Sequence, residues 1–246
     1  MKLIFLSMII FIASCASTSI NIIQSFTGDE NILIVSKFDD KILVKKHVRI
    51  SWSSPDFYVN VDDWNINQRV TEKTINFLSQ KYSTYSNNEI SENILTPSIN
   101  FFTGYPNPIM LDQVKPYLVD NNIDYILLIS PIEFNGVFGG NTNSDGLGVF
   151  QNTISGQYSK AFGLVSVNVY DAESGKYVYG NGNVGINDPR SNWFYSSNIN
   201  IPTITKASDL LNDDLVYVRN NIDRILDILL RRSVDDLSLG INPPPV

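Results

Sequence analysis

The chain has 246 residues, of which 43% are hydrophobic and 17% charged, a composition that suits a globular fold of one or two domains. With 18 basic and 25 acidic residues the net charge is −7, which disfavours nucleic acid or an anionic membrane surface as the main partner. One Cys and one His exclude a disulfide scaffold, a zinc finger and any metal site that needs several histidines.

The first residues are typical of a secretory signal peptide. Lys2 gives a positive start, residues 3–12 form an apolar run, and Ala13 and Ser14 are small. The run is shorter than the roughly 20 residues that span a bilayer, so we expect no transmembrane anchor. The predicted division is a signal peptide, a lipidated tether, one α/β domain and a flexible tail, over residues 1–14, 15–30, 31–232 and 233–246.

Ile12-Ala13-Ser14-Cys15 resembles the bacterial lipobox, which reads aliphatic, small, small, Cys. The resemblance implies cleavage before Cys15 and acyl chains on it. Each buried methylene contributes roughly 0.8 kcal/mol, so two or three chains would hold the protein firmly in a membrane. Ala16 stands where an Asp would indicate inner-membrane retention in enteric bacteria, so the resemblance implies the outer membrane, with the domain in the periplasm. The alternative is a plain signal peptide with an incidental Cys.

Strand-like segments open the predicted domain. Residues 32–35 and 42–50 flank the turn signal Asp39-Asp40, which predicts a hairpin. A short strand near residues 99–102 would interrupt a long polar connection.

Three segments have the spacing of amphipathic helices. Apolar side chains recur at helical spacing in residues 66–78, and Asp62 or Asp63 could cap the first turn of that helix. A second helix is predicted near residues 111–118, and a long C-terminal helix over about residues 208–232.

Later segments add further strands. The apolar run over residues 123–129 is typical of a strand covered on both faces, and residues 164–179 give the clearest hairpin signal. The sequence therefore predicts an α/β (α+β) fold, with a mixed sheet of about four to six strands packed by two or three helices.

Two segments and the order of elements resemble the α/β domain shared by several envelope lipoproteins. The segments are Asn122–Leu127, a helix end running into a buried strand, and Val167–Lys176, a strand-turn-strand pattern. Similar domains occur in the amino-terminal part of TolB, the curli secretion channel protein and lipoprotein activators of peptidoglycan synthases. Over Asn31 to Arg232, the resemblance implies an assembly, secretion or activator role without enzymatic activity.

Residues that could carry catalysis or bind a metal are few. His47 is the only imidazole, and no Ser lies in a G-x-S-x-G elbow, so a catalytic triad is not predicted. Asn141, Asn143 and Asp145 follow the first half of a calcium-loop pattern, but Asn152 stands where that loop needs a bidentate Glu. We therefore predict no cofactor and keep these three residues as a weak calcium candidate.

The Gly- and Asn-rich stretch over residues 134–161 is predicted to be the functional loop, because long loops in compact domains usually have a role. It carries apolar side chains suited to a protein interface, namely Phe134, Val137, Phe138, Phe150 and Tyr158. The alternative is a solvent loop with its aromatic rings turned inward.

The leading hypothesis is an outer-membrane lipoprotein that acts through protein–protein contact in envelope assembly or secretion. Its partners would be the membrane, through acyl chains on Cys15, and an envelope protein, with a second copy of the chain as a further candidate. A glycan or small-ligand module is the alternative; it would stack ligands on two aromatic clusters, Trp52-Phe57-Tyr58 and Trp193-Phe194-Tyr195. A hydrolase with dispersed carboxylates ranks last.

Overall fold

The computed structural model describes residues 26–47, 56–98, 106–138, 143–154, 157–181 and 193–239. The predicted signal peptide with Cys15, the strand near residues 99–102, Trp52 and Asn141 lie outside the described residues.

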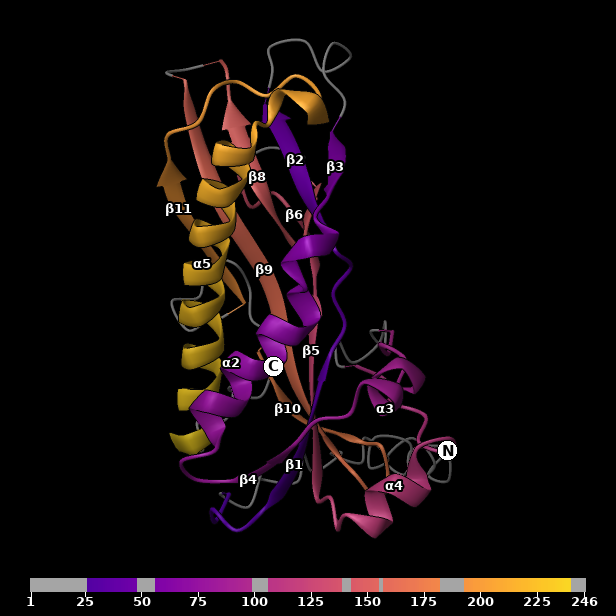
Figure 1. Cartoon of the computed structure of the whole chain (residues 1–246). Helices are drawn as coiled ribbons and strands as arrows, with labels where there is room; N and C mark the ends of the chain where they lie inside the picture. Colours follow the sequence, from indigo (N-terminus) through magenta and orange to yellow (C-terminus); the bar gives the residue numbers. More distant parts are fainter. Residues whose placement is uncertain are drawn as a thin grey trace, which may run out of the picture.

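The long strand β9 (Tyr158–Asp171) is the axis of a mixed nine-stranded sheet (Figure 1). Its first half pairs with β8 (Leu147–Asn152) on one side and β11 (Phe194–Ile199) on the other. Its second half pairs in the same way with β5 (Tyr125–Pro131) and β10 (Tyr177–Gly180). The sheet therefore consists of two halves that share one strand.

Four more strands extend the two halves: β1 (Asn31–Ser36), β2 (Lys41–His47), β3 (Phe57–Asn60) and β4 (Ser83–Tyr85). β2 lies beside β8 and carries β3 at its edge, which completes what we call the upper half-sheet, β11-β9-β8-β2-β3. β1 lies between β5 and β4, which completes the lower half-sheet, β10-β9-β5-β1-β4.

The hairpin predicted around Asp39-Asp40 is wrong. β1 runs parallel to β5, and β2 runs parallel to β8. Because β5 and β8 both run antiparallel to β9, β1 and β2 point the same way. Residues 37–40 are thus a step from the lower half-sheet to the upper one, and not a reversal of the chain.

The strand number of about four to six was also too low. The predicted loop over residues 134–161 overlaps β6 (Glu133–Asn135) and contains β7 (Asn143–Asp145), β8 and the start of β9. β6 and β7 form a separate two-stranded sheet. In contrast, the hairpin predicted over residues 164–179 is confirmed, since β10 pairs antiparallel with β9 across the turn that contains Gly175.

The described residues form four α-helices, where two or three were expected. α2 (Ile66–Leu78) is where the sequence placed it, and α4 (Lys115–Asp120) overlaps the predicted second helix. α3 (Asn88–Asn93) was not predicted. α5 (Asn212–Leu239) starts later than expected and continues seven residues into the predicted tail, so the tail boundary at 233 is wrong. The burial of Ser233 and Val234 explains why the helix continues.

The predicted cap of α2 was also wrong. Asp62–Trp64 form a short 3-10 helix, and Asn65 takes a left-handed conformation, with φ of 49°, between it and α2. The amide of Ile66 donates instead to Oδ1 of Asp40, at 3.0 Å. Asp40, in the step between β1 and β2, therefore accepts a hydrogen bond from a backbone amide that has no partner within the first turn of α2.

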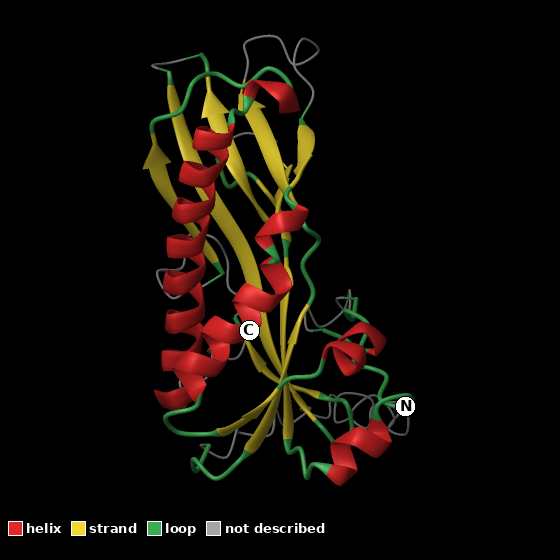
Figure 2. Cartoon of the chain, viewed as in Figure 1, coloured by secondary structure: helices red, strands yellow, loops and turns green. Residues whose placement is uncertain are grey.

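The helices cover both faces of the sheet (Figure 2). In β1, Ile32 and Ile34 pack on the side of α2 and α5, while Leu33 and Val35 pack on the side of α3 and α4. α5 crosses β9 at Gly163, where an added Cβ would lie 2.8 Å from Cγ2 of Ile225. The glycine therefore permits the close approach of helix and strand.

The described segment starts before the predicted domain boundary. Phe26 lies within the predicted tether, but its ring packs 5.0 Å from that of Tyr125 and 6.0 Å from that of Tyr82, measured between centroids. The folded body therefore begins by Phe26 rather than at Asn31. None of the helices in the described part of the chain combines the length and the apolar composition that a membrane span requires.

Candidate functional site

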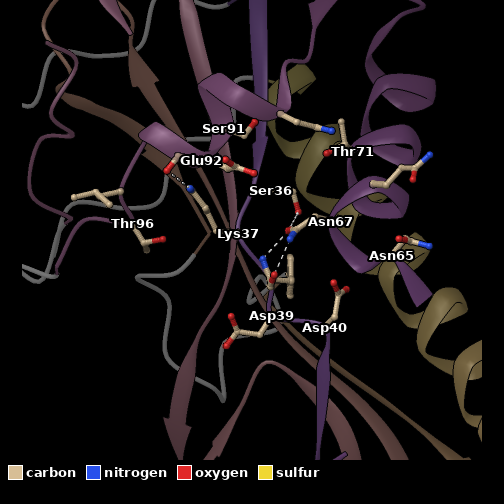
Figure 3. Close-up of a pocket in the computed structure, with 14 residues that line it drawn as sticks. Ser36, Lys37, Asp39, Asp40, Asn65, Asn67, Thr71, Ser91, Glu92 and Thr96 are labelled. Atoms are coloured by element: carbon tan, nitrogen blue, oxygen red, sulfur yellow. Dashed lines mark hydrogen bonds between the residues drawn. The ribbon is translucent and has the colours of Figure 1, made fainter. Parts of the chain in front are cut away.

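A crevice lies between α2 and α3 at the carboxyl end of β1 (Figure 3). α2 packs on one face of the sheet beside β1, and α3, which follows the neighbouring parallel strand β4, packs on the other face. The carboxyl ends of the strands are where α/β proteins commonly bind ligands. The volume of the crevice, about 530 Å³, falls within the range of about 300–1,000 Å³ that is usual for small-molecule sites.

One wall of the crevice is fixed by the side chain of Asn67. Its Oδ1 accepts hydrogen bonds from the Ser36 hydroxyl at 2.9 Å and from the Phe38 amide at 2.7 Å, while its Nδ2 donates to the Phe38 carbonyl at 2.6 Å. The Lys37 amide donates to the carbonyl of Ile129 at 2.9 Å. The step from β1 to β2 is therefore held in one conformation against α2 and β5.

Charged side chains surround the same space. The Lys37 ammonium donates to the backbone carbonyl of Glu92 at 3.3 Å. Burial lowers the pKa of Lys37, and the Glu92 carboxylate partly opposes that effect. Asp39 pairs with Lys41 at 2.8 Å, and Asp40 holds the start of α2 through one of its two oxygens.

A second, smaller hollow of about 350 Å³ adjoins the crevice. Glu92 and Leu95 line both spaces. Leu95 is 64% exposed, and Met110, which lines only the second hollow, is 72% exposed. Apolar surface is therefore available beside a polar crevice.

A different surface unites the residues of the predicted interaction loop. The face of the upper half-sheet opposite α5, which we call the outer face, carries a cluster around Leu43, Phe150, Phe162, Leu164 and Trp193. Phe138 stacks on Phe150 at 4.0 Å, and Phe134 lies 4.8 Å from Trp193 between ring centroids. Phe134, Val137 and Phe138 are partly buried in this cluster, and Phe150 is fully buried.

The expectation of an exposed aromatic loop is therefore wrong for most of these residues. Tyr158 is the exception, since it is 41% exposed and its ring lies 6.2 Å from that of Phe150. Gly and Asn between the apolar residues hid the strand pattern, because both residue types are uncommon in strands.

Tyr58 shares the outer face with Tyr158. It pairs with Leu43 across β3 and β2, and directly opposed residues lie on the same face of a sheet. The side chain is 47% exposed, and its hydroxyl donates to Asp145 at 2.9 Å. Burial, then the bond to the Asp145 carboxylate, raises the pKa of Tyr58 to about 12.

A lysine accompanies each of these tyrosines. The Lys41 ammonium lies 4.9 Å from the ring centroid of Tyr58, and the Lys160 ammonium lies 5.6 Å from that of Tyr158. Cation–π contacts of this kind contribute about 0.5–1 kcal/mol at exposed sites. We call Tyr58 and Tyr158, with their lysines, the tyrosine rim.

Two side chains of the weak calcium candidate, Asn143 and Asp145, form hydrogen bonds with other side chains. Asn143 donates to the Glu133 carboxylate across the β6–β7 pair, and Asp145 accepts from Tyr58. Across the described residues, no group of three His, Cys, Asp or Glu side chains could hold a metal ion.

Of the two predicted stacking clusters, the one at Trp193 is contradicted. Trp193 is only 1% exposed and belongs to the cluster beneath the outer face, so it presents no surface to a ligand. Phe194 and Tyr195 are half-buried. His47 is half-buried at the end of β2, with its ring 6.4 Å from that of Phe150.

No protein-family model matches the sequence, and the search of curated proteins finds no relative. Among solved structures, a dodecamer of a PelC point variant from Paraburkholderia phytofirmans is similar to this chain, with a TM-score of 0.28 and 7% identity over 84% of this chain and 92% of that one. Similarity this low assigns no function.

Replacing Asn67 by Ala should destabilise the protein by about 2–3 kcal/mol, because three hydrogen bonds are lost and the Phe38 backbone groups lose their partners. Asn67→Asp should also destabilise the protein, since a carboxylate oxygen in place of Nδ2 cannot donate to the Phe38 carbonyl and would face its oxygen. Urea unfolding measures both, with the exposed Asn88→Ala as a control expected to stay within about 0.5 kcal/mol. Equal effects of Asn67→Ala and Asn88→Ala would refute the role given to Asn67.

Alkaline titration should show the Tyr58 phenol ionising near pH 12, where an ordinary tyrosine ionises near 10. Burial also raises the pKa of Tyr125 and of Tyr170, so the Tyr58 step is identified by comparing the parent with the variants. The folded state retains a proton that the unfolded chain has lost, so this contribution to stability is complete below about pH 10 and is lost as the pH rises towards 12. In Tyr58→Phe, the rise in phenolate absorbance near pH 12 should be absent. In Asp145→Asn, the same rise should occur at a lower pH, because the carboxylate that raises the pKa is gone. A step that survives in Tyr58→Phe would belong to another residue.

Proposed function

We propose that this chain is an envelope lipoprotein, anchored in the outer membrane through acyl chains on Cys15, that works by binding another protein and not by catalysis. The observation that carries the contact is the tyrosine rim. Half-exposed tyrosines supply large, amphipathic contact area, and Tyr is enriched among the residues that dominate binding energy at protein interfaces.

The surroundings of the rim support this use. The rigid aromatic cluster beneath the outer face holds Tyr158 against Phe150, and the bond to Asp145 holds Tyr58. Side chains fixed in this way lose little freedom on binding, which reduces the free-energy cost of association. Lys45, buried in the same half-sheet, pairs with Asp56 at 2.6 Å beside β3, so the edge of the face is charged.

The anchor follows from the lipobox resemblance at Ile12–Cys15, and it would concentrate the domain at the membrane surface. An acidic chain with a net charge of −7 has little electrostatic attraction to anionic lipid. Covalent acyl chains would therefore supply the membrane affinity that the polypeptide lacks.

Replacing Cys15 by Ser should release the protein from membranes, because serine provides no sulfur for acylation. Fractionation of cells that express each form measures this, with Cys15→Ser expected in the soluble fraction and the parent in the outer-membrane fraction. A variant that still sediments with the outer membrane to the same extent would refute the anchor.

A photoreactive phenylalanine analogue at Tyr158 should give a discrete crosslinked adduct in intact cells. The same analogue at the exposed Val119 of α4 serves as the control and should give none. Adding Tyr58→Ala to the Tyr158 probe should cut the adduct yield severalfold, since hot-spot tyrosines contribute more than about 1 kcal/mol. Equal crosslinking from Val119, or no effect of Tyr58→Ala in a protein that melts normally, would refute the rim as the contact.

A further inference from the structure

The crevice between α2 and α3 plays no part in the proposed protein contact, which uses the outer face of the upper half-sheet. We propose that the crevice and the hollow beside it bind an uncharged saccharide, a mono- or disaccharide unit. The inference is independent of the proposed function and rests on the side chains that line the two spaces.

Several polar groups of the crevice have unused hydrogen-bonding capacity. Within the described part of the chain, no hydrogen bond reaches the second oxygen of Asp40, the Glu92 carboxylate, or the hydroxyls of Thr71 and Ser91. Figure 3 shows Asp40 and Thr71 on one side of the space, with Ser91 and Glu92 on the other. Carboxylates only accept hydrogen bonds, whereas hydroxyls both donate and accept.

That combination matches the hydroxyl groups of a sugar, which also donate and accept. Sugar hydroxyls that donate to a carboxylate form charge-assisted bonds, roughly twice as strong as neutral ones. The bonds that hold Asn67 and Asp40 keep their elements in place before a ligand arrives. The crevice is therefore preorganised for directional polar contacts.

Charge excludes anionic ligands. The charged residues that line the crevice are one lysine, Lys37, and three carboxylates, Asp39, Asp40 and Glu92. The balance is thus 1 − 3 = −2, and Lys37 is already engaged with the Glu92 carbonyl. A phosphate or an acidic sugar would meet net repulsion here.

A peptide is disfavoured for a different reason. An extended peptide binds by adding a strand, which requires free backbone groups along an edge. In the wall formed by the step from β1 to β2, the amides of Lys37 and Phe38 and the carbonyl of Phe38 already have partners. Recognition at this wall must come from side chains.

The second hollow provides room for a second ring. Glu92 and Leu95 line both spaces, and Leu95 and Met110 expose apolar surface there. A sugar ring has an apolar face of C–H groups, which can pack on such side chains while its hydroxyls reach Glu92. One ring in each space would place Glu92 at the link between them.

Isothermal titration calorimetry on the full-length protein, in a detergent without a sugar headgroup, tests the proposal. The probes are cellobiose, maltose and N,N′-diacetylchitobiose, and at least one should bind saturably at up to millimolar concentrations. Glu92→Gln and Thr71→Val together should weaken that binding at least tenfold, because a charge-assisted and a neutral hydrogen bond are lost.

Glu89→Gln is the matched control, since Glu89 lies on the same helix but does not line either hollow. Glu89→Gln should leave the disaccharide affinity unchanged. The crosslinking test with Tyr58→Ala addresses the protein contact alone, so its outcome does not bear on disaccharide binding. Unfolding curves confirm that each variant is folded. The proposal is overturned if none of the three disaccharides binds, if glucose 6-phosphate or trialanine binds more tightly, or if Glu92→Gln/Thr71→Val binds as the parent does.

Discussion

The pairing of β9 with both half-sheets is the constraint on which the remaining architecture depends. Its first half hydrogen-bonds to β8 and β11, and its second half to β5 and β10. α5, whose 28 residues extend about 42 Å, packs along the same strand, where Gly163 allows close approach. Ion pairs from Arg69 to Asp223 and from Lys73 to Asp227 then join α2 to α5. A sheet that would otherwise be two small units becomes one elongated body.

Both candidate surfaces depend on this arrangement. The tyrosine rim lies on the outer face of the upper half-sheet, with Tyr158 at the start of β9 itself. The crevice lies where the chain steps from β1 in the lower half-sheet to β2 in the upper one. The step also supplies Asp40 to the start of α2, so the geometry of the crevice and the packing of the halves are coupled. The proposed protein contact and the proposed ligand site thus lie on one folded unit.

The sequence predicted those elements whose own residues determine them. Helical spacing located α2, the apolar run located β5, and the turn at Gly175 located the hairpin of β9 and β10. What it could not predict depends on partners distant in the chain. Asp39-Asp40 has the composition of a turn, yet the pairing of β2 with β8, about a hundred residues later, makes it a step. Residues 147–152, within the Gly- and Asn-rich stretch, form a buried strand because β2 and β9 flank them on both sides.

The candidate sites divide in the same way. The sequence correctly grouped Phe134, Phe138, Phe150 and Tyr158, but it could not show that packing against Trp193 and Phe162 would bury most of them. The crevice escaped prediction altogether, because Asp40, Thr71, Ser91 and Glu92 come from three separate elements. Each is unremarkable in its own segment, and only the packing of α2 and α3 on opposite faces, beside the end of β1, brings them together.

The most direct measurement of the shared-strand account is native-state hydrogen exchange in increasing denaturant. Amides of β2 and β8 report on the upper half-sheet, and amides of β1 and β5 on the lower one. Because both halves depend on β9 and α5, their opening free energies should converge on a single global unfolding transition. Exchange of the β2 and β8 amides through a separate, less costly opening, with β1 and β5 still protected, would show that the halves are independent and contradict the account.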